Sequence, residues 1–197
     1  MENNWILPEV QKDIDALKQE ELVKKQNLED SRFLEGDLHP NYVLIDAALW
    51  GTEINILLLD ENVTYKSLFR GSTGEELWSV APYLVDISSN EELVKKIREK
   101  DAIEHRVTWL SSSLNIDELR KHLRRFLRMK TEKGEYIYFR FYDPFVTNTV
   151  FPNLSQEQAA EFFENIDYMI ADDIRINEKR VFYLSSEKTL QIKQQTL

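Results

Sequence analysis

Residues 136–163 read YIYFRFYDPFVTNTVFPNLSQEQAAEFF, and this stretch carries the most information about the fold of the chain. It opens with alternating aromatic and apolar residues, which predict a strand. Asp143 and Pro144 then favour a turn, because an Asp side chain can bond the backbone nearby and proline fixes its own φ. Ser155 and Gln158 have the spacing of a capping box. The stretch therefore predicts a strand, a sharp turn and a new helix in succession.

Short apolar runs alternate with helical patterns upstream of this stretch. Strands are predicted over 42–48, 65–69, 82–88 and 105–113, and helices over 52–61, near 75–81, after a capping box of Ser89 and Glu92, and over 117–130. Residues 167–186 resemble two or three edge strands with a turn at 177–179. Strands that alternate with helices favour the α/β class. We expect a mixed, largely parallel sheet with flanking helices and a less regular C-terminal lobe.

A segment rich in turn-forming residues at 36–41 marks a boundary near the N-terminus. Before it, residues 8–34 place apolar side chains at helical spacing, which predicts an amphipathic helix. That helix either packs on the domain or serves as an arm that binds a partner. The predicted organisation is an N-terminal helical arm over 1–38, a domain over 39–185 with two lobes that divide near 113 (39–113 and 114–185), and a C-terminal tail over 186–197.

Composition excludes several classes of protein. The chain has 35 acidic and 25 basic residues and a formal net charge of −10, which disfavours binding to nucleic acid or to anionic membranes. It contains no cysteine, so disulfides, thiolate metal sites and a cysteine nucleophile are excluded. No apolar run approaches the ~20 residues that a membrane span needs, and the first residues do not resemble a secretory signal. We expect a cytoplasmic protein without membrane insertion.

The residues that usually carry catalysis do not form a recognisable pattern. The three histidines lack metal-ligand spacing, and the five glycines match no phosphate-binding motif. No G-x-S-x-G sequence marks a nucleophilic serine. We therefore expect no catalytic residue, no metal site and no cofactor, and predict that the protein is not an enzyme.

Residues 117–130 concentrate positive charge in one predicted helix. They hold six basic residues against two acidic ones, with Arg120, Arg124 and Arg128 at helical spacing on one face and Arg125 beside them. These arginines either pair with the acidic body of the domain or bind an acidic partner. Arg and Trp often dominate the energetics of interfaces. The candidate partner-binding residues are Arg120, Arg124, Arg125, Arg128, Trp5 and Leu17.

The FRFYDP segment at 139–144 has a predicted structural role. Arg140 shares a strand face with Tyr142, and an arginine among aromatic rings can stack on them while it pairs with a carboxylate. Asp143 and Pro144 begin the turn. We expect these four residues to anchor the turn and not to contact a ligand.

Four blocks of the chain resemble the type VI secretion effector chaperones, also called Tap- or Tec-type adaptors. In order, the blocks are YVLIDAA, SLFRGSTGEELWSVAPYLVDI, TWLSSSLNIDELRKHLRRFLRMK and YFRFYDPFVTNTVFPNLSQEQAAEFF, and the resemblance runs from about Tyr42 to Ile166. The chain departs from the family pattern at Ala47, where Gly is frequent, at Phe145, where Arg is common, and at Glu164-Asn165, which replace Gly-Pro.

The resemblance implies a function as well as a family. Members are expected to be cytoplasmic, non-enzymatic adaptors that bind a toxic effector protein and load it onto the VgrG spike of the secretion apparatus. Two alternatives remain open. The protein could be an immunity protein that binds and silences a toxin, or a small α/β enzyme.

Overall fold

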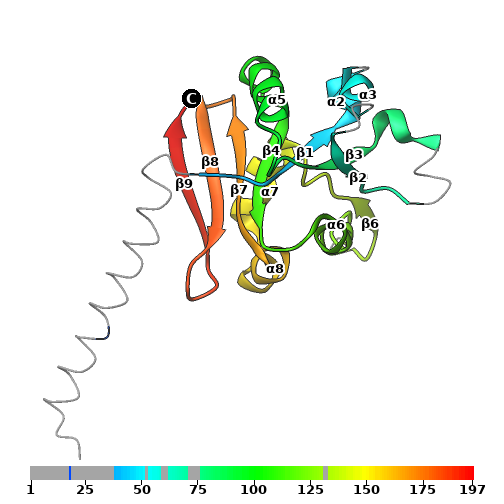
Figure 1. Cartoon of the computed structure of the whole chain (residues 1–197). Helices are drawn as coiled ribbons and strands as arrows, with labels where there is room; N and C mark the ends of the chain where they lie inside the picture. The colour runs from blue at the N-terminus through cyan, green and yellow to red at the C-terminus, as the bar shows by residue number, and fades with distance from the viewer. Residues whose placement is uncertain (1–17, 19–37, 52, 59–61, 71–75, 131–132) are drawn as a thin grey trace, which may run out of the picture. The chain divides into compact units, whose positions relative to one another are not determined.

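The computed structural model describes residues 18, 38–51, 53–58, 62–70, 76–130 and 133–197. The chain divides into residues 1–38 and residues 39–197, and the second unit is described below (Figure 1). Within the first unit only Lys18, a helical residue, and Leu38 are described. The predicted N-terminal helix, with Trp5 and Leu17, otherwise lies outside the described residues.

A seven-stranded sheet forms the centre of this unit, with the strand order β2-β3-β1-β4-β7-β8-β9. The strands are β1 (Tyr42–Asp46), β2 (Thr64–Ser67), β3 (Pro82–Asp86), β4 (Val107–Ser112), β7 (Ile166–Asp173), β8 (Glu178–Leu184) and β9 (Leu190–Thr196). Every neighbouring pair is antiparallel. The predicted largely parallel sheet is therefore wrong.

The order of the strands explains why no two neighbouring strands are parallel. β3 and β4 are connected by a helix and run in the same direction, as a βαβ unit requires, because β1 pairs antiparallel with both of them. Since β1 occupies the position between them, the two parallel strands never become neighbours. The alternation of strands and helices was recognisable in the sequence, but the insertion of β1 was not.

Helices cover both faces of the sheet. They are α2 (Ala47–Trp50), α3 (Glu53–Leu58), α5 (Glu91–Glu104), α6 (Ile116–Arg124), α7 (Pro144–Val150) and α8 (Gln156–Phe162), with 3₁₀ turns η1 (Trp78–Val80) and η2 (Phe151–Asn153). A core cluster joins Leu119 and Leu123 of α6 and Phe162 of α8 to strand residues such as Leu110 and Phe182. On the opposite face, Trp109 of β4 contacts α5 through a hydrogen bond to Asp101.

The helix α5 begins one residue later than predicted. Asn90, and not Ser89, is its N-cap, and the Asn90 side chain accepts the Leu93 N–H at 2.9 Å. The capping box predicted for Ser89 and Glu92 is therefore wrong. Asn90 can cap alone because its short amide oxygen reaches the free N–H of the first turn. Of the three side chains expected to point inward from this helix, Leu93 and Ile97 are buried, whereas Val94 is only partly buried.

The predicted basic helix ends early. α6 stops at Arg124, and Arg128 lies in a strand, β5 (Arg128–Lys130), which pairs with β6 (Tyr136–Tyr138) in a separate two-stranded sheet. The predicted ladder of three arginines on one helix is therefore wrong at Arg128. From Leu127 onward apolar and basic residues alternate with the period of a strand, and this change of period ends the helix.

Only the end of the decisive stretch agrees with the structure. Asp143 and Pro144 begin the helix α7, which was not predicted, and the strand at the start of the stretch is shorter than predicted. Ser155 and Gln158 form the capping box in both directions, with distances of 3.2 Å from the Gln158 N–H to Ser155 Oγ and 2.9 Å from the Ser155 N–H to Gln158 Oε1. The predicted strand over 136–142 is β6 alone, and the chain then turns into the core. Farther on, β7 is an interior strand and not an edge strand, and residues 190–196 form β9.

Candidate protein-binding surface

The local sequence determines how α6 presents its arginines. Asn115 caps the helix, with its side-chain oxygen 3.1 Å from the N–H groups of both Asp117 and Glu118. Leu119 and Leu123 are completely buried against the sheet. Because apolar residues occupy one face, the basic residues are left on the other face of the helix.

Arg120 fastens α6 to the sheet. Its Nε donates to the carbonyl oxygen of Ser67 at 2.6 Å, and its Nη2 donates to the carbonyl oxygen of Phe69 at 2.9 Å. Ser67 is the last residue of β2, and Phe69 follows shortly after the strand. Arg120 is thus engaged within the domain through two of its N–H groups.

Arg125 connects α6 to α8. Its guanidinium lies 2.6 Å from Glu161 and 3.7 Å from Glu164, and all three side chains are about half exposed. Exposed pairs of this kind contribute little to stability, typically about 0.2 to 1 kcal/mol. Arg125 is therefore a neutralised surface residue.

Arg124 differs from its two neighbours. Its Nε is buried and has no hydrogen-bond partner among the residues that the structure describes. Burial lowers the pKa of Arg124, and the nearby cations Arg120 and Arg70 lower it further. A half-buried guanidinium beside two other cations would be stabilised by an added anion.

The β5–β6 hairpin adds the most exposed part of this region. Arg128 lies directly opposite Tyr138, and Lys130 lies directly opposite Tyr136. Directly opposed residues of antiparallel strands share a face, so two tyrosines and two cations form one face of the hairpin. Met129 of β5, whose side chain points to the other face, packs against the core cluster.

We call Arg124, Arg128, Lys130, Tyr136 and Tyr138 the hairpin surface. Tyr136 is 69% exposed and Tyr138 is 46% exposed. Arg128 and Lys130 are exposed as well, and neither forms an ion pair with another described residue. Tyrosine and arginine are among the residues that most often carry the binding energy of protein interfaces. The hairpin surface can therefore bind a partner with acidic and aromatic or apolar groups.

The FRFYDP segment lies beside this surface. Its charged side chains form ion pairs within the domain. Arg140 Nη2 is 2.5 Å from Asp46 Oδ2 and 3.4 Å from Asp143 Oδ2. Asp46 is almost completely buried and also caps α2 by accepting the Ala48 N–H at 2.9 Å. Asp143 caps α7, whose first residue is Pro144. Arg140 thus joins the end of β1 to the start of α7.

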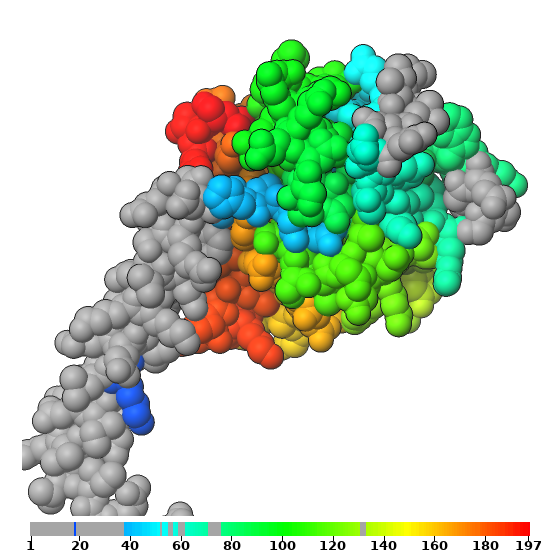
Figure 2. Space-filling model, in the orientation of Figure 1, coloured from blue at the N-terminus to red at the C-terminus, as the bar shows by residue number. Residues whose placement is uncertain are grey.

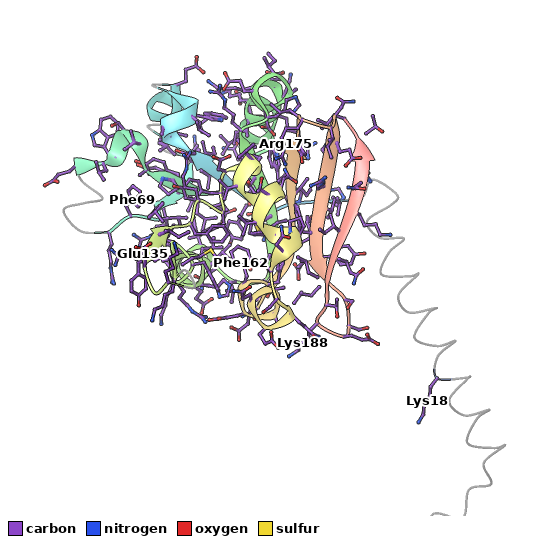
Figure 3. All side chains as sticks on the ribbon, turned by 180° about the vertical axis from the view of Figure 1, so that it is seen from behind. Lys18, Phe69, Glu135, Phe162, Arg175 and Lys188 are labelled. Carbon is purple, nitrogen blue, oxygen red and sulfur yellow. The ribbon has the colours of Figure 1, made fainter. Side chains whose placement is uncertain are left out.

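We call the FRFYDP segment at 139–144 the turn motif. Tyr142 links this turn motif to the hairpin surface. Burial raises the pKa of the Tyr142 phenol, and the nearby Tyr138 and Asp46 raise it further. The Phe69 ring lies edge-on to the Tyr138 ring at 5.9 Å. Figure 3 shows Phe69 and Glu135, the residue before β6, on the same side of the domain. Tyr138 is therefore held from two sides, which lowers the entropy that it loses on binding.

Sequence reasoning found only part of this surface. It selected Arg124 and Arg128, together with Arg120 and Arg125, which are engaged within the domain, and it missed Lys130, Tyr136 and Tyr138. The alternation of Tyr136, Ile137 and Tyr138 was visible, but the pairing of each tyrosine with a cation across β5 was not. Trp5 and Leu17 lie outside the described residues.

Two further classes of site were tested on the described part of the chain. There, no group of three or more His, Asp or Glu side chains has the arrangement of a metal site. Within the same ranges, none of the helices combines the length and apolar character that a membrane crossing needs.

The match to a family model covers most of this unit. Residues 41–161 match a family described as a domain of unknown function, DUF4123. The chain belongs to the DUF4123 family. The DUF4123 region extends from β1 into α8, so it contains both the turn motif and the hairpin surface. No curated protein and no solved structure matches the chain.

Proposed function

We propose that this DUF4123 protein is a cytoplasmic adaptor that binds a toxic effector of a type VI secretion system and loads it onto the VgrG spike. Membership of the DUF4123 family and the four sequence blocks that resemble effector adaptors support this proposal. In the same proposal the protein is not an enzyme, and its partners are proteins and not nucleic acid.

One observation carries the proposal, namely the exposed tyrosine–cation ladder of the hairpin surface. It places two aromatic side chains and two cations without ion pairs on one face of a short hairpin. The chain as a whole has a net charge of −10, so this positive patch is a local exception. Such a patch favours an acidic surface on a partner through both attraction and steering.

The test is a pull-down of the tagged protein from cells that express the secretion system, with the recovered partners identified by mass spectrometry. The variant Arg128→Glu with Lys130→Glu reverses the charge of the hairpin face. We expect it to lose either the effector or the spike protein while it unfolds at the same temperature as wild type. Lys95→Glu with Lys188→Glu, which reverses two exposed cations elsewhere, is the matched control and should retain both partners.

Each other outcome has a defined meaning. Recovery of a toxin without the spike would favour the immunity-protein alternative. Unchanged recovery of both partners by the hairpin variant would show that the hairpin surface is not the contact. A complete absence of partners would contradict the adaptor function itself.

A further inference from the structure

A second surface feature lies away from the hairpin. A groove of about 1210 Å³ runs between α5 on one side and α2 and α3 on the other, with residues next to β2 and β3 as its floor. In Figure 1 α5 and α3 both lie at the top of the domain, and the space-filling view of Figure 2 shows the segment of α5 above that of α6, on the other side of the sheet. We call this feature the α5 groove.

The α5 groove is acidic. Five carboxylates line it, against two lysines, Lys96 and Lys100; the carboxylates are Glu53, Asp86, Glu92, Glu99 and Glu104. Both lysines are already engaged inside the groove. Lys96 Nζ lies 2.9 Å from Glu92, and Lys100 contacts Glu53 and Glu104. A ligand that enters the groove therefore meets an excess of negative charge.

Apolar side chains accompany these carboxylates. Ile103 of α5 is 82% exposed, the highest value among the large apolar residues that the structure describes, and it lies at the rim of the groove. Val63 and Leu93 form part of its buried floor. An exposed isoleucine over an apolar floor provides a place for an apolar side chain of a partner.

Trp50 supplies an independent observation in the wall of the groove. The side chain is buried, and its Nε1–H has no hydrogen-bond partner among the described residues. The Lys100 ammonium lies 4.9 Å from the centre of the Trp50 ring and also donates to the Trp50 carbonyl oxygen at 3.3 Å. This indole N–H is a buried polar group without an acceptor, next to the groove.

Size favours a peptide over a metabolite. Sites for small molecules usually occupy about 300 to 1,000 Å³ and enclose most of the ligand. The α5 groove is larger and is bounded by a helix of 14 residues. A groove along a helix suits an amphipathic segment that lies lengthwise in it.

We propose that the α5 groove binds a basic, amphipathic segment of a partner protein. Lysine or arginine side chains of that segment would pair with Glu92 and Glu99, which lie two turns apart on α5, and would displace their exposed partners Lys96 and Lys95. An apolar side chain would pack between Ile103 and the floor. The α5 groove shares no residue with the hairpin surface. This inference goes beyond the proposed function, because it does not depend on which protein binds the hairpin.

The test uses the purified full chain and a fluorescent synthetic peptide as long as α5, built of leucine and lysine at helical spacing. The same peptide with glutamate in place of lysine is its control. We expect the lysine peptide to bind and the glutamate peptide not to bind. Glu92→Gln with Glu99→Gln should weaken binding roughly tenfold, since two charge pairs are lost. Ile103→Ala should weaken it to a smaller extent.

The matched control variant is Glu157→Gln with Glu187→Gln, which neutralises two exposed carboxylates outside the groove. It should bind the lysine peptide as wild type does. Both double variants should keep the wild-type unfolding temperature, because all four side chains are exposed. Equal loss of binding in the two double variants, equal binding of the two peptides, or no binding to wild type would each overturn the inference. None of these results would affect the hairpin variants, so the two proposals can fail separately.

Discussion

The turn motif and the hairpin surface are neighbours that use the same kinds of side chain in different ways. In the turn motif, the Arg140 guanidinium pairs with the buried carboxylate of Asp46 within the domain. In the hairpin surface, Arg128 and Lys130 have tyrosines opposite them and no carboxylate within reach among the described residues. The difference shows that a count of basic residues does not locate a binding surface. The arginines available to a partner are those whose donors are not already used inside the protein.

The largest expected effect is on the turn motif. Asp46→Ala should lower the free energy of unfolding by about 3 kcal/mol, because it leaves Arg140 without its main partner and removes the cap of α2. Chemical denaturation measures this directly. Asp117→Ala, which removes an exposed carboxylate that pairs with Lys66 at 3.0 Å, should cost under about 0.5 kcal/mol. Equal costs for the two variants would show that the buried Asp46–Arg140 pair contributes no more to stability than an exposed ion pair does.

The next effect concerns binding and not stability. Tyr136→Ala should weaken the complex with the partner of the hairpin surface by about 2 kcal/mol, roughly 30-fold, because an exposed tyrosine there acts as an interface anchor. Calorimetric titration with the recovered partner measures the affinity. The unfolding temperature should remain that of wild type, since Tyr136 is largely exposed. A loss of stability without a loss of affinity would assign Tyr136 to the fold.

A smaller effect is expected where the two regions meet. Tyr142→Phe removes a buried hydroxyl group beside Tyr138 and should cost about 1 kcal/mol of stability near neutral pH. Tyr136→Phe is the matched control and should leave stability unchanged. If the link orients Tyr138, Tyr142→Phe should also weaken partner binding slightly, and unchanged binding would show that the link is structural only.

The smallest effect is a pH dependence of the same variant. Burial raises the pKa of Tyr142 in the folded state, so the unfolded chain loses this proton first as the pH rises. The contribution of Tyr142 is therefore complete below about pH 10 and is lost progressively above it. The stability difference between wild type and Tyr142→Phe should shrink from pH 8 to pH 11. A difference that stays constant over that range would contradict the burial of the phenol.

Much of the local structure could be predicted from the sequence, and the reasons are physical. The capping box of Ser155 and Gln158 is a short-range signal, and so is the pair Asp143 and Pro144, because a cap or a turn depends on neighbouring residues only. The direction of the sheet was predicted wrongly because the position of β1 between β3 and β4 depends on pairing across 60 residues or so. The early end of α6 was missed because Arg128 fits both the helical spacing of the preceding arginines and the alternation of a strand.

The hairpin surface and the α5 groove also differ in how much of each could be predicted from the sequence. Single residues of the hairpin surface were accessible to sequence reasoning because Arg124 and Arg128 belong to one basic segment. The α5 groove was not predicted, since Trp50, Asp86 and Glu99 come from three separate elements and only the fold brings them together. Whether a given arginine is engaged, as Arg120 is, also depends on contacts with distant backbone.

The most direct test of the central claim places a photo-crosslinking residue, p-benzoylphenylalanine, at position 136 in cells that express the secretion system. The account predicts a crosslink to a secretion effector or to the VgrG spike from position 136, and none from position 187, which is also exposed. Crosslinks to such a partner from position 187 but not from position 136 would contradict the assignment of the hairpin surface as the contact.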